Sequence, residues 1–237
     1  MNEDTQHEVR IRARHIEAEG QVRISLDVEP AMRAAHLHPG QFIELVLGER
    51  PTERGYFALS NAPGEGETFE LLVRTDAADG GDAAALLGGL AVGASVRSSA
   101  VLGTGFPLER IGKRSVRVVA TGTAIAPARA AIDHLLRRRE VEVLSLDYGV
   151  RTARHVALAS ELARFNEAGV TVAVHFSGFR EGVLVGQLAH RALTHRWSEV
   201  AIEEEVILAV GQLEMVAELR ARWQALGGDP ADVLHNY

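Results

Sequence analysis

One stretch of the chain, VRVVATGTAIAP (residues 116–127), predicts a buried strand, a tight turn and the start of a helix, in that order. Gly122 and the small residues around it let a ligand approach the backbone, and the free N–H groups at the start of a helix favour an anionic group. Pro127 suits the first helical turn, where its missing N–H is not needed. The stretch therefore indicates a βα turn that can hold an anion, although a tight turn with nothing bound is the alternative at this point.

The same alternation of strand and helix continues to the end of the chain. Strand-like apolar runs lie at residues 115–120, 141–148, 170–176 and 205–210, and segments of helical periodicity lie at residues 126–139, 156–167, 185–194 and 213–226. Buried strands that alternate with helices are typical of a parallel sheet with crossover helices. We therefore predict an α/β parallel-sheet domain over residues 109–237.

The residues before this domain have a different character. Six short runs of alternating polarity lie at residues 9–15, 22–28, 42–47, 55–59, 69–75 and 95–100, with one short helical stretch at residues 82–90. Turn-forming residues separate the runs, and residues 103–113 have the glycine and proline content of a linker. The fold class predicted is an antiparallel six-stranded β-barrel over residues 1–108, followed by the α/β nucleotide-binding domain.

Composition limits the chemistry that this chain can carry. Hydrophobic residues make up 46% and charged residues 24% of the 237 residues, which is the balance of an ordinary globular protein. The absence of cysteine excludes disulfides, thiolate metal sites and iron–sulfur clusters, and His36 and His38 lack a third ligand nearby in sequence, so we expect no metal site. A net charge of −7 argues against nucleic acid as a partner. No apolar run approaches the roughly 20 residues that cross a bilayer, so we expect a soluble, cytoplasmic protein with no membrane partner.

Two further motifs lie in the first half of the chain. The stretch RGYFALSNAP (residues 54–63) places Arg54 and Tyr56 on one face of a strand, where a cation beside a ring suits a phosphate and a flat heterocycle. A plain barrel strand is the alternative for this stretch. Gly80 and Gly81 precede a short helix and offer a second possible phosphate cradle, for which a loop and a helix N-capped by Asp82 is the alternative.

In this order the motifs resemble those of the ferredoxin–NADP reductase superfamily, over nearly the whole chain. The resemblance rests on PGQF (residues 39–42), RGYFALSNAP and GTAIAP (residues 122–127). The stretch VLGTGFPL (residues 101–108) is similar to the segment that closes the barrel in the electron-transfer subunit of dihydroorotate dehydrogenase, whose iron–sulfur site this cysteine-free chain cannot build. The resemblance implies a barrel that binds FAD, with FMN less favoured, and a second domain that takes NADH or NADPH as co-substrate. It also implies an external electron acceptor protein or subunit.

The resemblance further implies roles for particular residues. Arg54 would pair with the FAD pyrophosphate, Tyr56 would pack on the isoalloxazine, and Tyr237 would shield the flavin until nicotinamide displaces it. We expect Tyr56, Phe57 and Tyr237 to lie at the reacting centre. The full set expected to bind FAD and the dinucleotide comprises Arg54, Tyr56, Phe57, Ala58, Ser60, Leu72, Val73, Gly80, Gly81, Asp82, Ala83, Thr121, Gly122, Thr123, Ala124, Pro127, Gly149, Arg151, Gly211, Gln212 and Met215.

Four positions depart from the pattern of the family. Phe57 and Ala83 stand where the family has Ser or Thr, Ala124 replaces a glycine, and Val210 replaces a cysteine that lies by the reacting nicotinamide. An added methyl at Ala124 would crowd a dinucleotide if that position needs a positive φ or a close approach. The first hypothesis is a flavin-dependent reductase that passes hydride from NAD(P)H to FAD and electrons onward. The departures motivate the alternative, a non-catalytic relative that binds flavin or nucleotide as a sensor or partner subunit.

Overall fold

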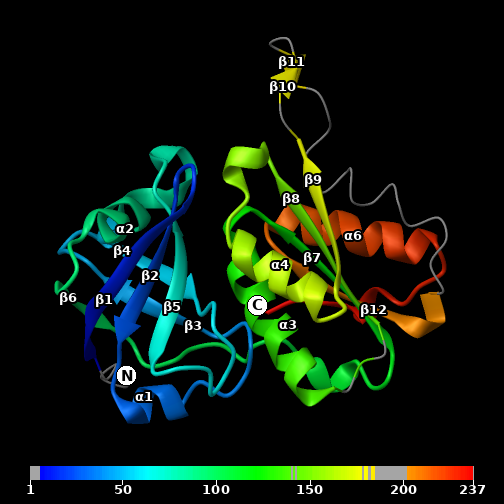
Figure 1. Ribbon diagram of the computed structural model, residues 1–237, viewed down its shortest axis with the longest axis horizontal. Helices are drawn as coiled ribbons and strands as arrows, with labels where there is room; N and C mark the ends of the chain where they lie inside the picture. The colour runs from blue at the N-terminus through cyan, green and yellow to red at the C-terminus, as the bar shows by residue number, and fades with distance from the viewer. Residues whose placement is uncertain are drawn as a thin grey trace.

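The computed structural model describes residues 6–139, 141, 143–177, 179–180, 183–184 and 202–236, with the backbone alone for residues 77–82, 179–180 and 183–184. Two sheets lie side by side (Figure 1), an antiparallel one formed by the N-terminal half and a parallel one flanked by helices in the C-terminal half. The predicted fold class, a β-barrel followed by an α/β parallel-sheet domain, is confirmed.

Six strands form the antiparallel sheet in the order β4-β3-β6-β1-β2-β5. The backbone N–H of Ser60, just beyond β4, donates to the carbonyl of Glu70 on β5 at 2.7 Å, which brings the two edges together and makes the sheet barrel-like. Alternate side chains fill the interior, as Ile24 and Leu26 show by being fully buried. Each predicted strand is present with its ends within three residues: β1 His7–Ala18, β2 Gln21–Asp27, β3 Phe42–Val46, β4 Arg54–Ala58, β5 Thr68–Arg74 and β6 Ser95–Ser98.

Two helices accompany this sheet in the described part of the chain: the first was not predicted, and the second was predicted with a later start. Helix α1 (Pro30–Ala34) is too short to leave a periodic signal. Helix α2 spans Ala77–Gly89, so it begins five residues before the predicted start at Asp82. Glycine is a poor helix former, so the sequence predicts that Gly80 and Gly81 precede the helix. In the structure both glycines lie within α2.

Five parallel strands form the second sheet, in the order β13-β12-β7-β8-β9. The bounds are β7 Ser115–Thr121, β8 Leu144–Val150, β9 Thr171–Phe176, β12 Glu205–Val210 and β13 Val233–Leu234, with a small antiparallel pair of β10 Phe179–Arg180 and β11 Val183–Leu184. The helices are α3 Ile125–Arg138, α4 Ala159–Glu167 and α6 Leu213–Ala225, and short 3-10 turns lie at Pro51–Glu53, Leu108–Arg110, Gly122–Ala124, Ala153–His155, Ile202–Glu204 and Pro230–Asp232. The helix predicted at residues 185–194 lies outside the described residues.

Sequence periodicity placed most of these elements correctly and missed details at their ends. Strand β8 and helix α4 each begin three residues later than predicted, α4 because Leu158 takes a left-handed conformation with φ 55° immediately before it. Strand β13 was not predicted, since two residues carry no periodicity. Helices α3 and α4 cover one face of the sheet with Val116 and Val118, and α6 covers the other face with Trp223 against Ile207. No helix in the described part of the chain is long and apolar enough to cross a membrane.

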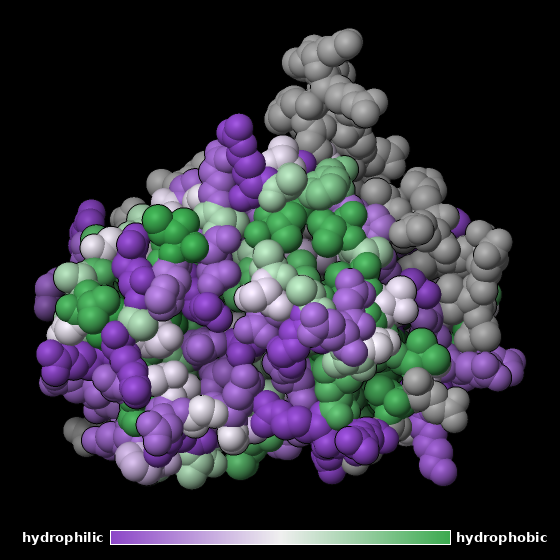
Figure 2. Space-filling view, in the orientation of Figure 1, coloured by the Kyte–Doolittle hydropathy of each residue, from purple (hydrophilic) through white to green (hydrophobic). Residues whose placement is uncertain are grey.

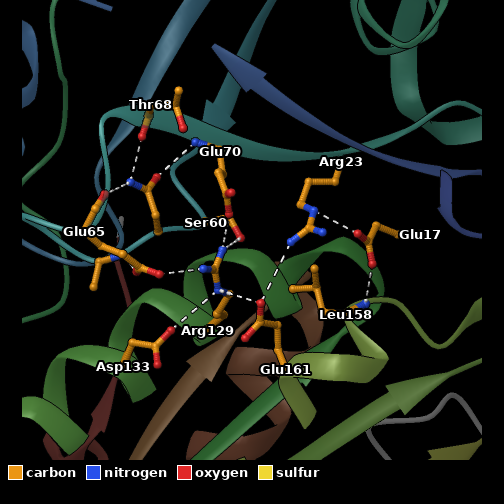
Figure 3. A network of polar contacts seen from close by, with 12 residues as sticks. Glu17, Arg23, Ser60, Glu65, Thr68, Glu70, Arg129, Asp133, Leu158 and Glu161 are labelled. Atoms are coloured by element: carbon orange, nitrogen blue, oxygen red, sulfur yellow. Dashed lines mark hydrogen bonds and ion pairs between the residues drawn. The ribbon is translucent and has the colours of Figure 1, made fainter. Parts of the chain in front are cut away.

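The seam between the two halves is polar and charged. Figure 2 shows hydrophilic residues gathered along it in this view. Figure 3 shows its centre, where the guanidinium of Arg129 on α3, only 5% exposed, reaches across to the barrel. Arg129 Nη2 lies 2.7 Å from Glu65 Oε1, and Arg129 Nη1 donates to the carboxylate of Glu70. Burial lowers the pKa of Arg129, but the carboxylates of Glu70 and Glu65 outweigh it and hold the pKa above its usual value, so this residue is a cation that joins the two halves.

Candidate functional site

A cleft of about 560 Å³ lies between the barrel and the carboxyl ends of the parallel strands. Strands β4 and β5 form the barrel wall, and the turns after β7, β8 and β12 form the opposite wall. The carboxyl ends of parallel strands are where α/β sheets bind ligands, because loops there leave backbone groups open to the cleft. Among the predicted site residues that the structure describes, thirteen line it: Tyr56, Phe57, Ala58, Leu72, Thr121, Gly122, Thr123, Ala124, Pro127, Gly149, Arg151, Gly211 and Gln212.

Strand β4 gives the barrel wall its aromatic surface. Tyr56 is 69% exposed as a residue, and its ring meets the Phe42 ring edge to face, with centroids 5.7 Å apart. An aromatic side chain this exposed offers its face to a flat ligand, while the contact with Phe42 fixes its orientation. Arg54 shares the outer face of the strand as predicted, but its Nη2 lies 3.2 Å from Glu44 Oε2 and it does not line the cleft. Phe57 packs partly against the barrel core and still lines the cleft.

The turn after β7 forms the centre of the opposite wall. Gly122 has φ 55°, a left-handed conformation that favours glycine, and its carbonyl accepts a hydrogen bond from the hydroxyl of Tyr148 at 3.1 Å. Tyr148 is fully buried, and burial raises the pKa of its phenol far above the usual range, so it remains a neutral donor that holds the turn from below. Ala124 has φ −65° and ψ −10°. It therefore needs no positive φ, and alanine stands there without backbone strain.

The turn after β12 packs against the first one. A Cβ on Gly211 would lie 2.6 Å from Thr121 Oγ1 and 2.9 Å from Met215 Cε, so only glycine fits between them. Met215 is buried beneath this turn, with its sulfur 3.8 Å from Thr121 Oγ1, and supports the cleft without lining it. Val210 lines the cleft at the strand end, where it presents only an apolar side chain.

Other predicted residues lie away from the cleft or beyond the described atoms. Ser60 is buried at the seam, 3.4 Å from Arg129 Nη1, and Val73 belongs to the barrel core. Ala83 is buried, and its Cβ is 3.0 Å from where a Cβ on Gly55 would stand, so α2 packs closely on β4. The side chains of residues 80–82 and all of Tyr237 lie outside the described part of the structure.

The cleft also contains polar residues that sequence reasoning missed. Arg74 at the end of β5 and Asp76 beyond it line the cleft with Arg151, and Arg151 Nη2 lies 2.8 Å from Asp76 Oδ2. Gln21 lines it as well and donates through Nε2 to the carbonyl of His155 at 3.0 Å. The first contact joins residues that are 75 positions apart in the sequence, and the second joins residues that are 134 positions apart, so no local motif could have signalled either one. The one sequence signal for Arg74 was its position as a charged residue at the end of a predicted strand, where a side chain can reach a ligand.

Comparison with known proteins agrees with this arrangement. Residues 118–220 match the family model of the oxidoreductase NAD-binding domain. Among solved structures, the flavohem-like FAD/NAD-binding domain of a nitric oxide dioxygenase from Vibrio cholerae is 22% identical with a TM-score of 0.76, and 96% of each chain is covered. A cytochrome P450 reductase from Amycolatopsis is 21% identical with a TM-score of 0.79, covering 97% of this chain and 69% of that one. A ferredoxin–NADP+ reductase from Neisseria gonorrhoeae, solved with FAD and NADP, is 16% identical with a TM-score of 0.77, covering 95% and 93%.

No curated protein gives a significant match to the chain. The structural likenesses show the two-domain fold of the ferredoxin–NADP reductase-like flavoprotein reductases across nearly the whole chain. The family match adds that residues 118–220, in the parallel-sheet half, are similar to the oxidoreductase NAD-binding domain. The resemblance inferred from the sequence motifs is thereby confirmed.

Proposed function

We propose that this protein is an NAD(P)H-dependent flavoprotein reductase. It would pass hydride from NADH or NADPH to FAD, and electrons onward to a separate carrier or partner subunit. The observation that carries the proposal is the cleft itself, in which the exposed ring of Tyr56 stands opposite the Gly122 and Gly211 turns. The carboxyl ends of parallel strands are where such sheets bind dinucleotides, and the aromatic wall opposite suits a flat cofactor that must lie against its substrate.

The residues present fit both cofactors. Tyr56 offers an aromatic face to a flavin, the Gly122 turn offers backbone to a phosphate, and Arg151 offers a cation. When bound, the flavin supplies the hydride acceptance and the one-electron chemistry. We assign residues 1–108 to flavin binding and residues 109–237 to NAD(P) binding. The alternative FMN would use the same ring wall, and it has no adenosine to place.

The protein's own contribution would be to orient the ligands and exclude water. Phe57 and Val210 both line the cleft, and neither carries a hydroxyl or thiol. The two walls would therefore order the rings by packing, with no proton donor at those two positions. This apolar pair also supports the second candidate function, a non-catalytic relative that binds flavin or nucleotide as a sensor or a partner subunit.

A visible absorption spectrum of the purified protein, followed anaerobically by NADH and then NADPH, tests the proposal. A flavin band that bleaches with either donor supports the reductase and identifies the coenzyme. A flavin band that neither donor bleaches favours the sensor or subunit, and a protein that takes up no added FAD or FMN contradicts both candidate roles for flavin.

A pair of substitutions separates the two candidates further. Phe57→Ser with Val210→Cys should raise the rate of flavin reduction in a reductase, because it introduces the polar groups that the family uses at these positions. Val206→Cys is a matched control, since Val206 is a buried residue of the same strand that does not line the cleft. An unchanged rate in the double variant, with flavin still bound, would favour the non-catalytic role.

A further inference from the structure

A second pocket, of about 660 Å³, lies where the linker between the two halves meets the C-terminal segment of the chain. Its lining comes from the barrel at His38, from linker residues 104–110, from α6 at Arg220 and from residues 231–235. Its volume is within the range of small-molecule sites, which is about 300–1,000 Å³. None of its described lining residues also lines the cleft, so the second pocket is a separate feature of the molecule.

Contacts between distant parts of the chain hold the walls of the second pocket together. The backbone N–H of Phe106 donates to the carbonyl of Pro39 at 2.8 Å, which fixes the linker to the barrel. Arg114 Nη2 donates to the carbonyl of Arg110 at 2.7 Å, and Arg114 Nη1 lies 2.8 Å from Asp232 Oδ2, which fixes the linker to the C-terminal segment. The fold therefore forms this pocket without help from a ligand.

Two arginines that line the second pocket have no carboxylate partner among the described residues. The side chain of Arg110 makes no hydrogen bond or ion pair within that part of the chain, and the residue is exposed. Arg220 donates from Nη2 to the carbonyl of Val233 at 3.2 Å, and its buried Nε has no partner among the described atoms. The adjacent carboxylate, Asp232, is already paired with Arg114. Two guanidinium groups thus keep most of their donors available beside the pocket.

The charge of the lining favours an anionic ligand. Glu109 is the one carboxylate residue in the described lining, against the two arginines. His38 adds an imidazole, which can donate a further hydrogen bond through a ring N–H. Guanidinium groups match the geometry of carboxylates and phosphates, because their parallel N–H groups bind two oxygens at once.

We propose that the second pocket binds a small organic anion, whose carboxylate or phosphate group contacts Arg110 and Arg220. The volume leaves room for the body of such a molecule beside its charged group. This site goes beyond the proposed function, because it requires neither flavin nor nicotinamide coenzyme.

The C-terminal segment connects the second pocket with the cleft. Val233 and Leu234 line the pocket, whereas Asn236 lines the cleft and donates through Nδ2 to the carbonyl of Gly40 at 2.9 Å. An anion held by the linker and by α6 would fasten this segment between the two halves. A ligand that binds only the folded state also raises its stability, so at ten times its Kd it should raise the Tm by about 3–6 °C.

The test is a titration of the whole protein with succinate and, separately, with glycerol 3-phosphate, at constant ionic strength. Amide NMR spectra should show saturable shifts at residues 104–110 and 231–235, together with the Nε–H signal of Arg220. The signals of the Gly122 and Gly211 turns should shift less, because those turns line the cleft. The probe with the lower Kd shows whether the site prefers a carboxylate or a phosphate.

Substitutions of the two arginines should weaken both probes by different amounts. Arg220→Gln should raise the Kd by about tenfold or more, because it removes a charged donor at a half-buried position. Arg110→Gln should raise it by about threefold to fivefold, since solvent screens an exposed charge. Because Arg110 is exposed and its side chain has no partner among the described residues, this variant should fold even if Arg220→Gln does not.

Two control variants separate this site from other cations. Arg97→Gln removes an exposed arginine of β6 that does not line the second pocket, and it should leave the Kd of both probes unchanged. Arg151→Gln removes a cation of the cleft, and it should likewise leave the shifts at residues 104–110 unchanged.

Three results would overturn the proposal. Shifts confined to the Gly122 and Gly211 turns, or abolished by Arg151→Gln, would place both probes in the cleft. Equal affinities of Arg110→Gln, Arg220→Gln and Arg97→Gln would show that the two arginines hold no ligand. Shifts that grow without saturating would show only a diffuse attraction of anions to the surface. None of these readouts depends on flavin reduction, so a failure of the proposed function would leave them unchanged.

Discussion

Removing the Arg129 side chain should destabilise the protein through the seam between its two halves. In Arg129→Ala, Glu70 loses its ion pair across the seam, whereas Glu65 keeps Arg137 at 3.2 Å and Asp133 keeps Arg164 at 2.7 Å. Breaking a buried pair by removing one partner costs about 3–5 kcal/mol. The Glu70 and Glu65 side chains are 22% and 30% exposed, so water can partly solvate the carboxylates that lose Arg129. We therefore expect the free energy of unfolding to fall by about 2–4 kcal/mol.

Differential scanning calorimetry measures this loss. Each kcal/mol shifts the Tm of a protein of this size by about 2–4 °C, so a loss near 3 kcal/mol predicts a Tm lower by about 6–12 °C. Arg12→Ala is the control, because its pair with Asp27 is half exposed and should cost less than about 1 kcal/mol.

The expected cause of this loss is the Glu70 carboxylate, which is left without its ion-pair partner, and a second substitution tests this cause. Arg129→Met with Glu70→Gln should recover a large part of the stability lost in Arg129→Met alone, because no buried charge is left without its partner. Two outcomes would refute the reasoning: a Tm change in Arg129→Ala no larger than in Arg12→Ala, or strictly additive effects of the two substitutions in the double variant.

Three further predictions concern a buried histidine, a close-packed glycine and a buried hydroxyl group. Burial lowers the pKa of His36 from 6.5 to about 4, so the folded state holds the imidazole neutral. As the pH falls from 6.5 to 4, the protein should lose up to about 3 kcal/mol of its free energy of unfolding, because only the unfolded chain takes up the proton readily. Urea unfolding of His36→Phe should lack this pH-dependent loss, and parallel pH profiles for the two proteins would contradict the prediction. Gly211→Ala should lower the Tm, because the new Cβ would lie 2.6 Å from Thr121 Oγ1, and Gly227→Ala, with no atom within 4 Å but φ 94°, is the control that carries backbone strain alone. Tyr148→Phe should cost about 1 kcal/mol in urea unfolding, since the carbonyl of Gly122 loses its donor at 3.1 Å, and an unchanged midpoint would show that the turn does not need it.

The fold could be predicted largely because its signals are local. Burial on one face of a strand leaves alternation, and burial on both faces leaves an apolar run, so the strands of both sheets were found to within a few residues apart from the short β13 and the pair β10–β11. The site was predictable where it depends on turns that follow strands, as at Gly122 and Gly211. It was not predictable where it depends on how the two halves face each other, which determines that Asp76 meets Arg151 and that Ser60 lies under Arg129.

The four departures from the family pattern differ in kind once their surroundings are known. Ala124 sits in a helical conformation and Ala83 lets α2 pack on β4, so both are compatible with an intact cleft wall. Phe57 and Val210 line the cleft, so these two positions determine which chemical groups face a bound ligand. A loss of function by decay would be expected to disturb the turns and glycines as well, yet Gly122 and Gly211 retain the conformation and the space that the cleft requires. Of the four departures, Phe57 and Val210 are therefore the two that bear on catalysis, and the rate of flavin reduction in their double variant tests their effect.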